Sequence, residues 1–449
     1  MRIITVVLLV LIAAGTAIGL ALLWPDPAKV ELMADRAQIS ATGMSYEQGE
    51  ILSLGGACDA QTGAAAGPST GADDDAGATG TAQSCRLISV GVLSGPDEGR
   101  MVEIALRGGL AGAGLEVGDH VELIAYTTAE QPVAQPGGGE ESGDAAGAGQ
   151  AAAGEASYRL AISYDVAGVE RNVPLLVLAI LFAIVVVAVG RFRGLFALVA
   201  LGVSAGVLLF FVLPALVAGG PGLLIALVGS SAIMFVTLYF VHGPNMRTTA
   251  ALIGTLCGIA IMAIISVIAV HTTRLSGVGD EASGLLSTFT TGAAGPTIDF
   301  RGLLTCAIII AGLGILNDVT ITQASAVWEL RAVAPTMSRR EIYARGMRIG
   351  RDHLASTVYT VFFAYVGAAM SVLILLYLYN RPMLSLLTRE DIAVEIVRTL
   401  VGSIGLVLAI PITTAIATLF VPPAADPEPE QPSEPGGRPG SPEPVAPAI

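Results

Sequence analysis

The sequence predicts an all-α polytopic membrane protein, a bundle of about eight transmembrane helices, with a small β-rich domain outside the membrane. Three observations predict this fold class. The chain of 449 residues is 53% hydrophobic but only 13% charged, whereas soluble domains carry about 25% charged residues. Long apolar runs recur along the chain. Alternating polar and apolar residues gather in one polar stretch between the first two runs.

The apolar runs are long enough to cross a bilayer. A spanning helix needs about 20 residues, because in hydrocarbon the backbone must satisfy its own hydrogen bonds. The first run gives an N-terminal anchor over residues 1–24, and the others give a seven-helix domain over 173–421. The expected spans are Ile3–Leu23, Pro174–Gly190, Gly194–Val217, Gly222–Val241, Thr248–Val270, Gly302–Ala326, Leu354–Tyr379 and Thr399–Val421.

The first run has a second interpretation, as a signal peptide that is cleaved. Its apolar stretch, Ile3–Leu23, is longer than the ~7–15 residues of a signal h-region. Trp24 follows it, where an interfacial aromatic residue would lie. We therefore expect the run to stay as an anchor, with cleavage as the alternative.

Arginine sets the expected orientation, because positively charged loops stay in the cytoplasm. The largest group of arginines near the spans falls between the sixth span and the seventh. With eight spans, both termini are then cytoplasmic, residues 25–172 lie outside, and the Pro/Glu-rich segment 422–449 is a disordered cytoplasmic tail. The composition, rich in Ala, Gly and Val, is typical of a GC-rich bacterial genome, and we expect the membrane to be the bacterial cytoplasmic (inner) membrane. The dominant arginines are Arg331, Arg339, Arg340, Arg345, Arg348 and Arg351.

The polar stretch 25–172 is expected to be a small OB-like barrel. Residues alternate between polar and apolar in Arg100–Leu106 and Tyr158–Tyr164, and Val117–Ile124 reads as a turn followed by a strand. Several short strands with glycine turns are typical of such barrels. Two insertions at 61–84 and 131–155, rich in Gly, Ala and acidic residues, are expected to be disordered loops.

Cys58 and Cys85 flank the first insertion. Both lie in the part expected outside the membrane, where the setting is oxidising, so we expect a disulfide that closes the base of the loop. Two unpaired thiols are the alternative. Zinc is less favoured, because no Cys or His pair at ligand spacing accompanies them.

The candidate chemistry lies in the sixth span. Asp318, Thr322, Ser325 and Glu329 recur at i, i+4, i+7 and i+11, which puts them on one face of a helix. An acidic residue inside a membrane is by default a candidate functional residue, either as a cation ligand or as part of a proton relay. The alternative is structural: the stripe holds helices together by hydrogen bonds, and Glu329 pairs with nearby arginines. Asn317 and Gln323 flank the stripe.

Several functions are excluded. The net charge of −14 and the lack of a basic, aromatic-rich surface argue against nucleic acid. The sequence has neither a phosphate-binding Gly-Lys-Ser/Thr loop nor a His-Glu-x-x-His metal site. A membrane aspartyl protease needs two facing carboxylates, and Asp318 is the single acid well inside an expected span. We therefore expect neither enzymatic activity nor a cofactor.

Five segments resemble one family. The run Gly314–Leu330, which reads GILNDVTITQASAVWEL, is similar to the signature of the YibE/F family of bacterial membrane proteins in its actinobacterial form, and so are Tyr239–Gly243, Thr249–Thr255, Ile349–His353 and Glu395–Gly405. The resemblance covers about residues 85–127 and 157–421. It implies an anchor, an outer β domain and a multi-span region, but no established activity from which catalytic residues could be carried over. The family often has an acid where Asn317 stands, which argues against a mechanism with two adjacent carboxylates here.

The function expected from the sequence is that of a permease for an unknown small solute or ion, embedded in the lipid bilayer and using the stripe of the sixth span. The main alternative is a non-transporting envelope scaffold or assembly factor that binds an envelope protein through the outer domain. A membrane-embedded enzyme ranks third. The many spans and the polar stripe favour the permease.

Overall fold

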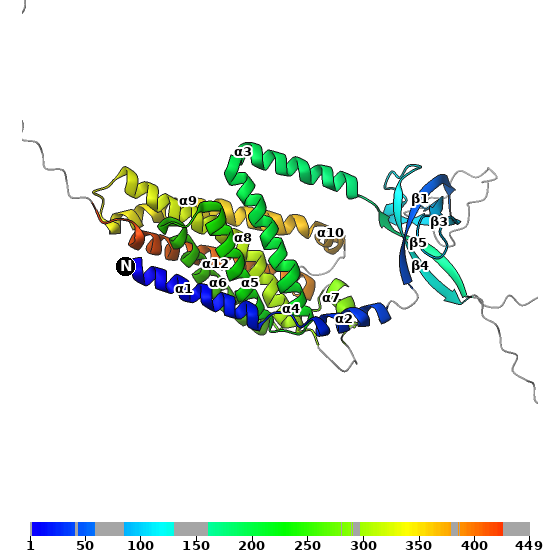
Figure 1. Ribbon diagram of the computed structural model, residues 1–449, viewed down its shortest axis with the longest axis horizontal. Helices are drawn as coiled ribbons and strands as arrows, with labels where there is room; N and C mark the ends of the chain where they lie inside the picture. The colour runs from blue at the N-terminus through cyan, green and yellow to red at the C-terminus, as the bar shows by residue number, and fades with distance from the viewer. Residues whose placement is uncertain are drawn as a thin grey trace, which may run out of the picture. The chain divides into compact units, whose positions relative to one another are not determined.

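The computed structural model describes residues 2–40, 44–58, 85–129, 160–279, 281–288, 290, 297–378, 385 and 387–424 (Figure 1). The chain divides into two compact units, one of Met1–Asp35 with Val185–Ile449 and the other of Arg36–Ile184. The first unit is helical and the second contains a β-sheet. The insertions expected at 61–84 and 131–155, and the tail beyond residue 424, lie outside the described residues.

The sheet has five antiparallel strands in the order β3-β2-β1-β4-β5. The long first strand pairs with β2 on one side and with β4 on the other. Its register with β2 shifts between Ile51 and Ser53 and again between Leu54 and Ala57, and such irregularities bend a strand. The two outermost strands, β3 and β5, also contact each other. The strands are β1 (Met44–Ala57), β2 (Cys85–Val92), β3 (Met101–Arg107), β4 (His120–Ala129) and β5 (Leu160–Val169), with a short 3₁₀ helix η1 (Gly108–Leu110) after β3.

One face of the sheet forms the core of this unit. Alternate residues of four strands are buried there, which is the period of two that a half-buried strand requires. The three stretches expected from the sequence fall on β3, β4 and β5, whereas β1 and β2 were not foreseen. The core is built from Ile51, Ile88, Val90, Val92, Ile104, Leu106, Val121 and Leu123.

Two acidic side chains join the β2–β3 loop to the sheet. Glu47 is 8% exposed, and its carboxylate accepts hydrogen bonds from the hydroxyls of Ser45 (3.0 Å) and Ser94 (2.7 Å). The hydroxyl of Tyr164 on β5 donates to Asp97 in the loop (3.1 Å). These bonds satisfy polar groups that would otherwise be costly to bury.

The helical unit has α6, α8 and α12 at its centre, each packed against the other two (Figure 1). Around them, α5 contacts α8 and α6, α9 contacts α12 and α8, and α1 contacts α5. Among the described residues, the helices are α1 (Arg2–Leu22), α2 (Pro27–Ser40), α3 (Asn172–Val207), the π-helical turn η2 (Leu208–Val212), α4 (Leu213–Val217), α5 (Gly222–His242), α6 (Met246–Thr272), α7 (Glu281–Thr288), α8 (Phe300–Val333), α9 (Arg339–Ala368), α10 (Met370–Leu378) and α12 (Glu390–Phe420).

Side-chain caps fix where the central helices begin. Asn245 accepts from the backbone N–H of Thr248 (2.9 Å) at the start of α6. Asp299 and Ser338 play the same part for α8 and α9. Such caps satisfy backbone donors that the first helical turn leaves unpaired.

Small residues let the central helices approach closely. A Cβ at Gly258 of α6 would lie 2.9 Å from Leu316 of α8 and 3.4 Å from Ala409 of α12. Close approach through small residues is how helices associate in lipid, where the hydrophobic effect does not drive them together.

Among the described residues, five helices are long and apolar enough to cross a membrane, or six if the bent pair Val6–Leu22 and Pro27–Arg36 forms one span. The sequence interpretation had eight. Part of the difference is the stretch Asn172–Val217, which counts as one candidate. It nevertheless breaks at Arg191, whose φ of 53° and ψ of −135° are not helical, at the boundary expected between the second and third spans.

The structure differs most from the sequence prediction at the seventh expected span, Leu354–Tyr379. The structure has a helix that starts earlier, α9, and a second short one, α10; Tyr379 lies outside the described residues. The arginine-rich turns that were expected to form a loop are helical, because Ser338 caps them and Glu341 pairs with Arg345 one turn later (2.9 Å). Neither α9 nor α10 is among the five apolar candidates.

Candidate functional site

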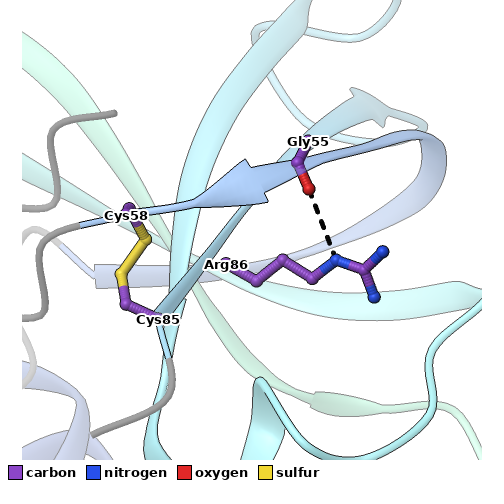
Figure 2. Close-up of a disulfide and its surroundings, with 4 residues drawn as sticks. All are labelled: Gly55, Cys58, Cys85 and Arg86. Carbon is purple, nitrogen blue, oxygen red and sulfur yellow. Dashed lines mark hydrogen bonds between the residues drawn. A yellow bond between two sulfur atoms is a disulfide. The ribbon is translucent and has the colours of Figure 1, made fainter. Parts of the chain in front are cut away.

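The two cysteines that flank the first insertion are bonded in the structure. Cys58 directly follows β1, Cys85 begins β2, and a disulfide joins them (Figure 2). Their Cα atoms lie 5.0 Å apart. The backbone N–H of Cys58 also donates to the carbonyl of Cys85 (3.1 Å). Next to the disulfide, Arg86 Nε donates to the carbonyl of Gly55 (3.4 Å; Figure 2). The bond therefore closes the segment 59–84 at its base.

The polar stripe lies along one side of α8, on the outside of the three-helix centre. Asp318, Thr322 and Glu329 are exposed and Ser325 is half-buried. The hydroxyl of Thr322 donates to the backbone carbonyls of Asp318 (2.7 Å) and Val319 (3.0 Å), so it is held within its own helix. The four residues share a face, as the spacing indicates, but the structure shows no direct side-chain bond among them.

Glu329 does not pair with the arginines that follow it, within the part of the chain that the structure describes. The nearest of them in sequence, Arg331, is instead buried, and its Nη1 donates to the carbonyls of Pro335 (2.9 Å) and Met337 (2.8 Å). These carbonyls lie beyond the end of α8, where unpaired carbonyl groups need donors.

The two residues that flank the stripe point elsewhere. Gln323 is 4% exposed, and its Nε2 donates to the carbonyl of Gly346 on α9 (2.8 Å) and to the hydroxyl of Thr414 on α12 (2.8 Å). The side-chain oxygen of Asn317 is buried without a partner among the described residues. Gln323 therefore joins three helices.

Two cavities lie between α8 and α9, and Tyr365 lines both of them. The first, the Asp318 cavity, has a volume of about 370 Å³ and is lined on α8 by Asp318 and on α9 by Thr357 and Thr360. The second, the Arg398 cavity, has a volume of about 440 Å³ and lies closer to the start of α8, between Leu303, Tyr365 and Arg398. Together the two cavities follow α8 from its first turn to about its middle.

The charged residues of the Arg398 cavity come from the first turns of α12. Arg398 Nη1 donates to Glu395 (2.7 Å), and Asp391 pairs with Arg389 (3.2 Å). Glu390 accepts from the backbone N–H groups of Ser276 (2.7 Å) and Gly277 (2.9 Å) and from the hydroxyl of Ser276 (2.6 Å). Glu390 thus fixes the loop after α6, whose Gly277 and Gly279 line the cavity.

Sequence reasoning missed Tyr365, Thr357 and Thr360 of α9 and Glu395 and Arg398 of α12. A signal for them exists. The spacing of Thr357, Thr360 and Tyr365 is that of one helix face, and Glu395 stands one turn before Arg398. The pattern does not reveal which other helix such a face meets, because that depends on how the helices pack.

Comparison with known proteins gives a single family. A family model described as YibE/F-like protein matches residues 178–423, which is more than half of the chain. No curated protein and no solved structure matches. The matched segment contains all of α8, α9 and α12 and therefore both cavities.

Proposed function

The chain belongs to the YibE/F-like family. We propose that it is a multi-pass membrane permease that moves a small solute or ion through the Arg398 cavity and the Asp318 cavity. One observation carries this proposal: the Arg398 and Asp318 cavities are neighbours along α8, and Tyr365 lines both of them. A chain of cavities with polar groups inside an apolar helix bundle is what a transport pathway requires, because charged and polar side chains in lipid are expensive unless they face protein or water.

Asp318 is the acid that this pathway reaches about midway along α8. Its carboxylate lines a cavity with the hydroxyls of Thr357 and Thr360, and carboxylate and hydroxyl oxygens are ligands for hard cations. A carboxylate also carries a proton when it is protonated. The site therefore suits either a coupling cation or a coupling proton.

The test is flux in proteoliposomes loaded with a panel of ions and metabolites, with the wild type compared with Asp318→Asn. The substitution keeps size and hydrogen bonding but removes the charge. Glu341→Gln is the matched control, since it removes an acid that is exposed and paired at the start of α9. We expect flux by the wild type and the control and loss of flux by Asp318→Asn. Full flux by Asp318→Asn would reject the proposal.

An envelope scaffold without transport is the second candidate. It is favoured by the strand order of the outer sheet together with the contact between β3 and β5, which fits an OB-type, partly open barrel, a fold that often binds partners. Two results together would make this candidate replace the permease. No solute moves in any vesicle, and a chain with the sheet deleted inserts in the membrane but does not restore the phenotype that the wild type complements.

The cellular setting is part of the proposal. We place eight spans in a bacterial cytoplasmic membrane, with both termini inside and no enzymatic activity. The apolar helices and the break at Arg191 support the span count, because each leg of the broken helix is close to the ~20 residues that a span needs. The arginines in the last turn of α8 and in the first turns of α9 support the orientation.

A further inference from the structure

The Arg398 cavity has the dimensions of a ligand site. Its volume of about 440 Å³ lies within the ~300–1,000 Å³ that small-molecule sites occupy. Most of its wall is apolar, with Leu303, Leu304, Val372 and Ile392. Such a wall suits an apolar body, and the few polar groups then fix its orientation.

The charged groups of the cavity include Asp391, which pairs with Arg389, and the ion pair of Arg398 with Glu395, which can form further hydrogen bonds. Of the guanidinium donors of Arg398, Nη1 is bonded to Glu395 (2.7 Å), whereas Nε is buried without an acceptor among the described residues. A guanidinium has five N–H donors and a carboxylate accepts several hydrogen bonds. Arg398 and Glu395 can therefore each bind one further group of opposite charge.

A cation and an anion this close match a ligand that carries both charges. A ligand with a single charge would meet attraction from one member of the pair and repulsion from the other, whereas a zwitterion satisfies both. We propose that the Arg398 cavity binds a small zwitterion with an apolar substituent, of the chemical class of an apolar amino acid, with its carboxylate on Arg398 and its ammonium group on Glu395. This inference rests on the proposed permease function and names its substrate class.

The experiment measures binding directly, by a scintillation proximity assay of radiolabelled leucine on the full chain in detergent. Unlabelled isocaproate, which lacks the ammonium group, and isoamylamine, which lacks the carboxylate, serve as competitors. We expect saturable leucine binding and competition at least about tenfold weaker by either analogue, since each loses one charged contact.

The variants assign the two charges. In Arg398→Gln, leucine should bind no more tightly than isoamylamine. In Glu395→Gln, it should bind no more tightly than isocaproate. Arg345→Gln is the matched control, because Arg345 belongs to an exposed ion pair at the start of α9 and lines neither cavity. Ala307→Phe fills the cavity without changing any charge and should abolish binding. This variant still tests the proposal if a charge variant fails to fold.

The result separates this inference from the permease itself. Leucine binding that Ala307→Phe abolishes, without any flux, supports the site and rejects the permease. Flux that depends on Asp318, without leucine binding, rejects the site and leaves the permease. Binding that Arg398→Gln, Glu395→Gln and Ala307→Phe all leave unchanged also rejects the site.

Discussion

At the scale of single residues, the spacing of residues in the sequence shows which of them share a helix face, but not whether that face is buried or exposed. Asp318 and Thr322 share one face of α8, as their spacing predicts, and that face is exposed along the α9 side. Gln323 and Thr320, on another side of the same helix, are buried, and Thr320 shares a hydrogen bond with Thr255 of α6 (2.6 Å). The helices of this chain carry apolar residues on every side. The sequence therefore has no hydrophobic asymmetry that would show which helix face is buried.

Gln323 should contribute measurably to stability. Gln323→Leu removes hydrogen bonds to Gly346 and Thr414, and interhelical bonds in membrane proteins contribute about 0.6–1.7 kcal/mol each. We expect a loss of about 1–3 kcal/mol, seen as a lower midpoint of thermal unfolding in detergent. Thr322→Val, on the exposed side of the same helix, is the control and should shift the midpoint little. Equal midpoints for both variants would contradict the role of Gln323.

Tyr164 makes the sheet sensitive to alkaline pH. Burial, together with its hydrogen bond to Asp97 and the negative charge there, raises the pKa of Tyr164 above its ordinary 10.0. Because the folded pKa is the higher one, the stabilisation is complete below pH 10 and is lost as the pH rises through the folded value. Tyrosinate absorbance should show a late-titrating contribution that is lost in Tyr164→Phe. An unchanged titration in that variant would assign the shift elsewhere.

At the scale of elements, glycine decides where α9 approaches its neighbours. Gly346 and Gly350 face Gln323 and α12, and a Cβ at Gly350 would lie 2.6 Å from Ile410 and 2.9 Å from the side-chain oxygen of Gln323. The same helix diverges from α8 further along, where Tyr365 lines the two cavities. The sequence could place an apolar helix there, but not this crossing, because the crossing depends on contacts between distant segments.

Two glycine substitutions in α9 should have opposite effects. Alanine in the middle of a helix is intrinsically better than glycine by about 0.5–1 kcal/mol. Gly367→Ala meets nothing within 4 Å and should be neutral or stabilising. Gly350→Ala must displace Ile410 or Gln323 and should lower the thermal midpoint, since overpacking costs about 1–3 kcal/mol. The midpoints in detergent check this, and a Gly350→Ala variant as stable as Gly367→Ala would show that the two helices lie further apart.

The disulfide ties the ends of β1 and β2. Cys58 and Cys85 are 27 positions apart, and the chain-entropy argument gives roughly 3–4 kcal/mol for closing a loop of this size. Mass analysis of a non-reduced digest should find the two peptides linked in protein taken from membranes. Cys58→Ser with Cys85→Ser should then unfold the sheet at lower denaturant. Two free thiols in the isolated protein would contradict the bond.

At the scale of the whole molecule, composition, apolar runs and alternating residue patterns together predicted a helical membrane protein with one separate β-rich part, and the helices and the sheet agree with that outline. The number of crossings was harder to predict. Apolar length does not tell whether a long helix crosses once or turns back, because both arrangements bury the same residues in lipid. In the structure, the non-helical conformation of Arg191 marks the break between the two legs of α3.

The path of α3 decides the topology of everything after it. If the break at Arg191 separates two spans, the loop after α8 lies on the side opposite to residues 25–172. If Asn172–Val217 crosses once, that loop lies on the same side. The arginines that flank this loop, at the end of α8 and in the first turns of α9, favour the cytoplasm and hence two crossings. Reporter fusions after Gly137 and after Ser338 should therefore report opposite sides, with a fusion after Gly243 matching Ser338 as the internal control. The same side at Gly137 and Ser338 would mean that α3 crosses once and that the chain has one span fewer.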